Sequence, residues 1–279
     1  MQRKPSKYAG ISVSRRAPKF GALFVLGLGI VAAAAESRAA CVLDRRDEQA
    51  QVARVVDGDT LVLRDGRKVR LVGMNTPETA KPDHAGEPLA DEAMAALDGL
   101  LPAGSSVQLR LDHTPTDRYG RTLAHVYSAD GRNIGEELLT RGLASAIVVP
   151  PNVWQHRCYF AAEKIARANK RGLWQRQFYA PTTVQPHSRL QQRFQFIRGE
   201  VTAVFWTAKG ARLELNDTLS VRITRRDLPY FSRADILQLR GHTITVRGWL
   251  RHQNGQWQMQ LRHPSMISDD QPRHLSGKT

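Results

Sequence analysis

Short β-type runs separated by tight-turn residues dominate the first half of the chain. Residues 52–56 and 60–63 are such runs on either side of Asp57-Gly58-Asp59, and Asp65-Gly66 leads into a third run at 68–74. Aspartate and glycine favour tight turns, because aspartate hydrogen-bonds its own backbone and glycine tolerates positive φ. This spacing predicts a meander of three strands.

Further elements follow at regular spacing. Two more strands are predicted at 107–111 and 123–127, and a short strand at 144–149. Helices are predicted at 89–101, 134–141 and 153–170. Five strands with a helix inside the strand order, and helices behind them, favour a small closed barrel of OB type. In such a barrel, strand ends and loops gather at one mouth, so residues far apart in the sequence can converge.

Strand signals resume in the last third of the chain. We interpret residues 176–194, rich in Gln, Arg and Pro, as a linker, and residues 269–279 as a disordered polar tail. Residues 195–268 contain five more runs and a helix candidate at 233–239, which again favours an OB-like barrel. The predicted class is mainly β with helices (α+β): an OB-fold barrel over 50–175, followed by a second small barrel.

The N-terminus resembles an export signal. A basic stretch runs to Lys19, an apolar stretch covers 20–35, and Ser37 and Ala39 supply small residues before a cut after Ala39. We therefore interpret residues 1–39 as a signal peptide and predict a secreted or periplasmic protein without a stable membrane anchor. An uncleaved anchor is the alternative; twin-arginine and lipoprotein signals fit less well.

The charge of the chain favours a polyanionic partner. The formal net charge is +15, but residues 1–40 hold seven of the 41 basic and one of the 26 acidic residues, so the remainder carries +9. A surplus of this size attracts polyanions by steering and counterion release. A basic protein without an anionic partner is the alternative.

Two cysteines, Cys41 and Cys158, are the whole cysteine content of the chain. Two cysteines in an exported protein tend to pair, because the compartment is oxidising. We therefore predict a disulfide between them, and two unrelated thiols are the alternative.

Three polar runs beside predicted strands carry candidate chemistry. They are Asp57-Gly58-Asp59-Thr60, Arg70 with Asn75-Thr76-Pro77-Glu78, and Asp117-Arg118-Tyr119-Gly120-Arg121. Acids can hold a hard cation, arginines can clamp phosphate oxygens, and a glutamate can take a proton from water. Each run alone is an ordinary turn, strand end or solvated loop, but the ordered set predicts metal-assisted attack on a phosphodiester.

This set resembles the thermonuclease (staphylococcal-nuclease-like) family over about residues 50–175. Asp130-Gly131, residues 141–144 and Gly172-Leu173-Trp174 also fit the family. The resemblance implies an OB barrel with packed helices and calcium-dependent hydrolysis of DNA and RNA that leaves 3′-phosphates. Nucleic acid is thus the expected partner, and no obligatory protein partner is predicted.

The resemblance also implies a calcium site. Asp59 matches the first calcium carboxylate, Asn75 stands where a second carboxylate is usual, and Thr76 matches the position that offers its backbone carbonyl. Asn75 keeps an oxygen ligand but loses a charge, and calcium affinity depends on the number of charged ligands. We therefore expect a weaker metal site.

The remaining site residues are implied in the same way. Glu78 matches the general base or water-orienting residue, and Arg70 and Arg121 match the two phosphate-binding arginines. Arg118 and Tyr119 are predicted to contact the substrate, with Tyr119 stacking on a base. The signal peptide, cysteines and second module make the chain similar to an exported proteobacterial subgroup.

The C-terminal module interleaves aromatic and basic residues. They are Phe205, Trp206, Trp249, Trp257, Arg222, Arg225, Arg226, Arg247 and Arg251. Such groups could stack on bases and contact phosphates on an OB face. Equally, the tryptophans could fill the barrel core and the arginines could be solvated.

Three functions are compatible with these patterns. The first is a calcium-dependent nuclease, supported by the filled catalytic positions. The second is a nucleic-acid-binding protein of nuclease ancestry that is catalytically weak because of Asn75. The third is a cell-envelope protein whose basic face meets acidic polymers.

Overall fold

The structure is a computed structural model that describes residues 41–82, 85–186, 188 and 190–269. The predicted signal peptide (1–39) lies outside the described residues, as does the predicted tail beyond residue 269. No helix in the described part of the chain is long and apolar enough to cross a membrane.

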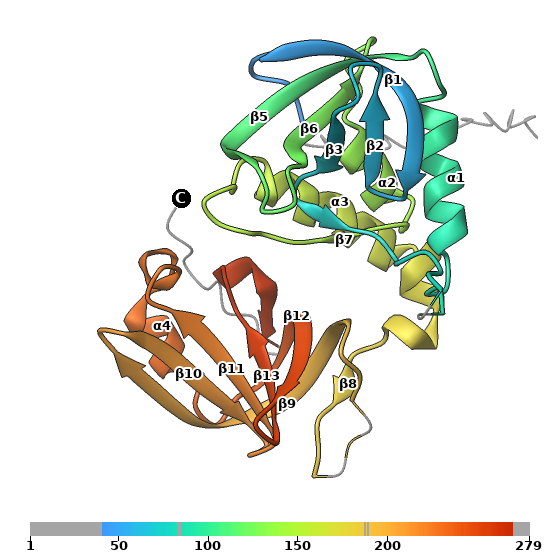
Figure 1. The fold of residues 1–279 in the computed structure, drawn as a ribbon. Coiled ribbons are helices and arrows are strands. Elements are labelled where there is room, and N and C mark those ends of the chain that lie inside the picture. The colour runs from blue at the N-terminus through green and yellow to red at the C-terminus, as the bar shows by residue number, and fades with distance from the viewer. Residues whose placement is uncertain (1–40, 83–84, 187, 189, 270–279) are drawn as a thin grey trace, which may run out of the picture. The chain divides into compact units, whose positions relative to one another are not determined.

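Five strands close the first barrel in the order β1-β2-β3-β6-β5 (Figure 1). Their bounds are Glu48–Asp57 (β1), Thr60–Leu63 (β2), Lys68–Leu71 (β3), Ser106–Thr116 (β5) and Thr122–Ser128 (β6). The β3–β6 pair is parallel and the others are antiparallel. Val52, Leu61 and Leu109 are fully buried in the core, as inward-facing positions of a small barrel are. The predicted barrel is confirmed.

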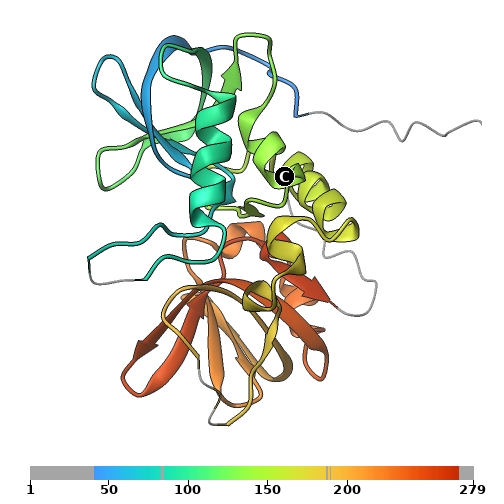
Figure 2. The ribbon, with the colours of Figure 1, turned by 90° about the vertical axis from the view of Figure 1, so that its right-hand side faces the viewer.

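Three helices pack on this barrel: α1 (Ala90–Leu100), α2 (Ile134–Thr140) and α3 (His156–Ala168). Figure 2 shows α1, in teal, alongside the strands, and its Leu97 is buried in the same core as Val52. Helix α3 begins later than the sequence pattern predicts, because Gln155 has φ 58°, which a right-handed helix cannot contain.

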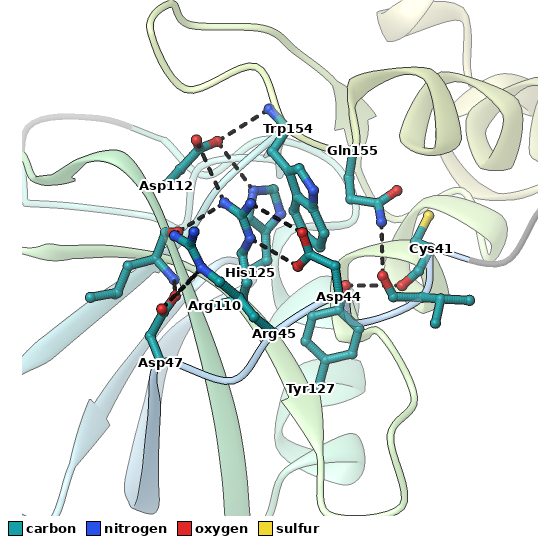
Figure 3. Close-up of polar contacts among 12 residues, drawn as sticks. Cys41, Asp44, Arg45, Asp47, Arg110, Asp112, His125, Tyr127, Trp154 and Gln155 are labelled. Atoms are coloured by element: carbon teal, nitrogen blue, oxygen red, sulfur yellow. Dashed lines mark hydrogen bonds and ion pairs between the residues drawn. The ribbon is translucent and has the colours of Figure 1, made fainter.

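A disulfide and side-chain hydrogen bonds fasten the segment before β1 to the barrel and to α3. Figure 3 shows the polar contacts of this segment, including those of Cys41, Tyr127 and Gln155. Cys41 and Cys158 form the disulfide, with their Cα atoms 5.6 Å apart. The Cys41 carbonyl accepts a hydrogen bond from the Tyr127 hydroxyl at 2.9 Å, and Gln155 Nε2 donates to the Val42 carbonyl at 2.9 Å. These contacts order a segment that has no regular secondary structure of its own.

A two-stranded sheet outside the barrel joins the end of β3 to the segment before α3. It pairs β4 (Met74–Asn75) with β7 (Ser145–Ala146). The strand predicted at 144–149 is limited to β7, although Ile147 N also donates to the Gly73 carbonyl at 3.0 Å. This small sheet holds Asn75, a candidate site residue, in a fixed backbone position.

The second barrel repeats the connectivity of the first. Its strands are β9 (Phe194–Thr207), β10 (Gly210–Leu215), β11 (Leu219–Thr224), β12 (Thr243–Gln253) and β13 (Gln256–Gln260). The β12–β9 pairing closes the ring, and β11 is parallel to β13 as β3 is to β6. The helix α4 (Arg233–Leu237) lies between the third and fourth strands, as α1 does. The similarity expected from the strand pattern is therefore confirmed at the level of strand order.

Several short elements complete the structure. They are the 3-10 helices η1 (Gly172–Gln175), η2 (Gln177–Tyr179), η3 (Leu228–Tyr230) and η4 (Pro264–Met266), and the strands β8 (Thr182–Thr183) and β14 (Ile267–Asp269). β8 pairs in parallel with β9, and Val184 is fully buried. The Tyr179 hydroxyl donates to the Pro88 carbonyl at 2.6 Å. The segment predicted as a linker is therefore packed.

A buried ion pair joins the second barrel to α3. The carboxylate of Glu163 lies 2.7 Å from Arg247 Nη1, and it also accepts hydrogen bonds from Arg167 Nε at 2.7 Å and from Ala146 N at 2.6 Å. Burial opposes the charged form of Glu163, but the two guanidinium groups hold its pKa below the usual value. The prediction that Arg247 is either a phosphate contact or solvated is wrong, because its guanidinium is enclosed beside this carboxylate.

Replacing Arg247 by methionine should destabilise the fold by about 3–5 kcal/mol, because it leaves a buried carboxylate without its main partner. Urea unfolding measures the effect. Arg251→Met is the matched control, four residues further along β12 and exposed, and should change stability by less than about 0.5 kcal/mol. Equal losses in the two variants would contradict a stabilising role for the Glu163–Arg247 pair.

Candidate active site

Strand pairing brings the first two polar runs and the start of β6 together. The Gly58-Asp59 turn is closed by the pairing of Asp57 with Thr60, and Thr60 in turn pairs with Arg70 on β3. On the other side of β3, Val69 pairs with Thr122, the residue that follows Arg121. Register therefore places Asp59, Arg70 and Arg121 on or beside three neighbouring strands of the barrel, β2, β3 and β6.

Gly58 allows the turn to pack closely against its surroundings. A Cβ atom at this position would lie 2.7 Å from the Ala93 Cβ of α1 and 2.9 Å from the Cβ and Oγ1 of Thr76. Both distances are shorter than real side chains adopt, so only glycine fits. The glycine lets Asp59 reach Thr76.

Asp59 is the central acid of the site. Its Oδ2 accepts hydrogen bonds from Thr76 N at 3.2 Å and Thr76 Oγ1 at 3.0 Å, and lies 2.7 Å from Arg70 Nη1. Burial, together with the nearby charge of Asp57, raises the pKa of Asp59 to about 6, although Arg70 acts in the opposite direction. One carboxylate thus links the β1–β2 turn to β3 and to the segment after β4.

Arg70 is held in place by backbone carbonyls as well as by Asp59. Its Nη1 donates to the Leu71 carbonyl at 2.9 Å, and its Nη2 donates to the Met74 carbonyl at 3.2 Å. The side chain is 14% exposed, so the guanidinium is partly open to a ligand. Fixed, partly desolvated guanidinium groups are suited to binding phosphate oxygens.

The residues expected to hold calcium offer oxygen donors, which fit a hard cation. They are the Asp59 carboxylate, the Asn75 side-chain oxygen and the Thr76 carbonyl. Asn75 Oδ1 lies 3.5 Å from Arg70 Nη2, and Asn75 Nδ2 donates to the Thr76 carbonyl at 3.2 Å. Among the described residues, one group of three His, Cys, Asp or Glu side chains is close enough to share a metal ion. It consists of Cys41, Glu136 and Cys158, and does not include Asp59, Asn75 or Thr76. The donor set therefore fits calcium but includes a single carboxylate.

Glu78 follows Thr76 by two residues and is exposed. Its carboxylate pairs with Lys81 Nζ at 2.9 Å, and its side chain is 52% exposed. Its backbone is anchored at Glu87, whose carboxylate accepts from Glu78 N at 3.2 Å. Within the described residues, Glu78 forms no hydrogen bond or ion pair with Asp59 or Arg70. The structure thus leaves this carboxylate accessible.

The β5–β6 loop forms a third group. Asp117 Oδ2 accepts from Arg121 Nε at 2.7 Å, and Oδ1 accepts from the backbone N–H groups of Tyr119 and Arg121. Partial burial acts to raise the pKa of Asp117, but these hydrogen bonds outweigh it and hold the pKa below its usual value. Tyr119 is 68% exposed, and the guanidinium carbons of Arg118 and Arg121 lie 4.7 and 5.6 Å from its ring centroid. This loop presents an aromatic face with two cations.

Three partners of the site residues escaped the sequence analysis. Lys81 pairs with Glu78, Asp117 pairs with Arg121, and Glu87 binds the Glu78 backbone. The first two are opposite charges three and four residues apart, a spacing that could have suggested these pairs. The Glu87 contact depends on how the loop folds back, which no local pattern shows.

The sequence analysis also missed a buried polar network (Figure 3). Asp112 Oδ2 accepts from Trp154 N at 3.2 Å and lies 3.5 Å from His125 Nε2. The Arg110 guanidinium stacks 3.9 Å from the Trp154 ring centroid. Burial of the imidazole lowers the pKa of His125 although Asp112 opposes the shift. The His125 side chain is fully enclosed, so we assign this network to stability.

The fold and the site together define an OB-barrel protein with a phosphodiesterase-type set of side chains. The sequence model of the Staphylococcal nuclease homologue family matches residues 68–176. A thermonuclease from Staphylococcus intermedius is 38% identical over 136 residues, 48% of this chain and 80% of the relative. The chain belongs to the staphylococcal nuclease homologue family.

Two further relatives agree. A thermonuclease from Staphylococcus hyicus is 32% identical over 156 residues, 55% of this chain and 91% of the relative. The endonuclease YncB from Bacillus subtilis is 37% identical over 131 residues, 45% of this chain and 61% of the relative. The family match covers β3 to η1, and the second barrel lies beyond it.

Replacing Gly58 by alanine should destabilise the fold by about 1–3 kcal/mol, because the new methyl group overlaps Ala93 and Thr76. Thermal unfolding measures this change. Gly99→Ala in α1 is the control: its Cβ would meet nothing within 4 Å, and alanine favours a helix, so stability should stay the same or rise. A neutral Gly58→Ala variant would contradict the close packing of this turn.

Proposed function

We propose that the chain is an exported, calcium-dependent nuclease that hydrolyses phosphodiester bonds of DNA or RNA and leaves 3′-phosphates. The observation that carries the proposal is the cluster of Asp59, Arg70, Asn75 and Thr76 in a chain whose relatives are named thermonucleases and endonucleases. The phosphate product and the calcium requirement follow from the resemblance to the family.

Each proposed side chain has one task in the reaction. Glu78 accepts a proton from the attacking water while the water oxygen bonds to phosphorus. The bond to the 5′ oxygen breaks, and that oxygen leaves with the bonding electron pair and takes a proton from solvent. Arg70 and Arg121 stabilise the charge that grows on the phosphate oxygens. Asp59, Asn75 and Thr76 would hold calcium, which would supply positive charge that stabilises the transition state. Arg118 and Tyr119 contact the neighbouring nucleotide, with Tyr119 stacking on its base.

The internal ion pairs define what the substrate must displace. Arg70, Arg121 and Glu78 each lie within 2.9 Å of an intramolecular counter-charge. A phosphate that binds the arginines therefore competes with Asp59 and Asp117. Exposed pairs of this kind contribute at most about 1 kcal/mol, so the Glu78–Lys81 pair is easily exchanged.

The compartment of the proposed enzyme is outside the cytoplasm. The disulfide between Cys41 and Cys158 is the supporting observation, because such bonds persist in oxidising compartments. Export by residues 1–39, with cleavage near Ala39, fits this disulfide, since Cys41 would lie at the start of the mature chain.

The weak-nuclease alternative rests on Asn75. With one carboxylate in the donor set, calcium binding could limit activity, and the protein would bind nucleic acid more readily than it cleaves it. The two proposals differ in turnover at millimolar calcium, which the following measurements test.

Glu78→Gln should lower kcat on a DNA or RNA strand by about 10²–10⁴-fold, because glutamine cannot accept the proton from water. Initial rates at millimolar calcium, with chelator as a blank, measure the effect. Glu92→Gln, on the exposed side of α1, removes the same charge and should leave the rate unchanged. An inert wild-type protein that still binds nucleic acid would favour the alternative.

Asn75→Asp should tighten calcium binding about 10-fold, because it adds a charged ligand at the proposed site. Isothermal titration with calcium alone measures the affinity. Asn133→Asp is the matched control, since it makes the same substitution at the N-cap of α2 and should leave calcium affinity unchanged. Equal affinities for wild type and Asn75→Asp would contradict calcium binding at Asn75.

A further inference from the structure

The turn that carries Asp59 has a counterpart in the second barrel. In the first barrel, Asp57 pairs with Thr60 across a two-residue turn, and Thr60 pairs with Arg70 on the third strand. In the second barrel, Thr207 pairs with Gly210 across Ala208 and Lys209, and Gly210 pairs with Thr224 on the third strand. The shared strand order therefore places Lys209 where the first barrel has Asp59, and Thr224 where it has Arg70.

This exchange reverses the charge of the barrel mouth. A lysine cannot be a calcium ligand, because its ammonium group has no lone pair to donate. Arg225 and Arg226 directly follow Thr224, and both are exposed, as is Lys209. Among the described residues, the side chains of these three cations form no hydrogen bond or ion pair. The counterpart of the proposed calcium site is thus a set of accessible positive charges.

An aromatic residue and two more arginines lie on the same outer face. Phe205 pairs with Arg212, Arg212 with Arg222, and Arg222 with Gln260, which makes one row across four strands. Side chains two residues apart on a strand share a face, so this row lies beside Thr207, Gly210 and Thr224. Phe205 is 47% exposed, and the Arg212 guanidinium carbon lies 4.5 Å from its ring centroid.

Positive charge on this face is only partly compensated. Glu214 pairs with Arg212 at 2.9 Å, whereas Asp227 is fully buried and accepts hydrogen bonds from Thr224 Oγ1 and Gln260 Nε2. Residues 195–268 hold eleven basic and five acidic residues, a net charge of +6. The face therefore attracts an extended anion.

We propose that this basic face binds single-stranded nucleic acid, with phosphates on its cations and a base stacked on Phe205. The basic face consists of Phe205, Lys209, Arg212, Arg222, Arg225 and Arg226. Backbone-tracking cations beside an exposed aromatic ring are what single-strand binding requires, because every base has a stacking face. A duplex hides those base faces. This site is distinct from the proposed nuclease site and is not catalytic.

Such a site predicts a length-dependent effect on the proposed nuclease. A long strand can be held by the second barrel while another segment occupies the first, which raises the local substrate concentration. A dinucleotide gains nothing from the basic face. The variants below should therefore raise KM on long strands and leave dinucleotide cleavage unchanged.

Fluorescence anisotropy with chelator present tests binding without cleavage. The probes are oligothymidylate and oligouridylate of about 20 nucleotides and a duplex of the same length. Lys209→Gln/Arg225→Gln/Arg226→Gln should weaken single-strand binding about 10-fold or more, and should reduce the slope of log affinity against log salt by about 2. Arg157→Gln/Lys164→Gln/Lys170→Gln removes three exposed cations at α3 and should bind as wild type does.

A second set of variants tests stacking. Phe205→Ala should weaken single-strand binding about 10-fold, whereas Phe205→Trp should retain it, because indole also stacks. All the substituted side chains are exposed, so circular dichroism should be unchanged. Equal affinities of the two triple variants, or duplex binding as tight as single-strand binding, would overturn the proposal. A wild-type protein that binds single strands but does not cleave them would contradict the proposed nuclease function and leave the proposal for the basic face intact.

Discussion

The buried carboxylate of Asp59 holds the candidate active site together. It bonds Thr76 and pairs with Arg70, so three separate chain segments depend on one charge. A buried charge is tolerated only when it is paired and hydrogen-bonded, and here the same partners are the proposed ligands. In the proposed site, a cation at Asp59 would compete with Arg70 for the carboxylate, and a phosphate would compete with Asp59 for Arg70. Binding of the cation and binding of the phosphate are therefore thermodynamically linked.

The second barrel is connected to this site through backbone pairing. Arg247 donates to the Ala146 carbonyl at 3.1 Å and pairs with Glu163, which accepts from Ala146 N. Ala146 pairs with Met74, whose carbonyl accepts from Arg70 Nη2. Three consecutive contacts thus lead from a buried arginine of one barrel to an arginine of the other. The second barrel therefore has a structural role: its Arg247 contacts the first domain, whether or not the second barrel also binds a ligand.

Local sequence patterns were enough to predict most of the fold. Asp57-Gly58-Asp59 and the runs around it gave the meander, and the two five-strand patterns gave both barrels. What the sequence could not show were contacts between distant residues. Arg247 and Glu163 are 84 positions apart, and each lies in a pattern that is typical of a surface. Likewise, the segment 176–194 has a linker composition, yet Tyr179 is buried because its hydroxyl reaches Pro88.

The site residues were identified by resemblance, and the structure adds what resemblance cannot give. It links Asp59, Arg70, Asn75 and Thr76 by consecutive polar contacts, whereas Glu78 pairs with Lys81. The two barrels share one connectivity, but Lys209 and Thr224 of the second barrel stand where the first has Asp59 and Arg70. A carboxylate attracts a cation and a lysine attracts phosphate directly, so the two proposals assign different chemistry to one backbone geometry: metal-assisted hydrolysis in the first barrel and metal-independent binding in the second.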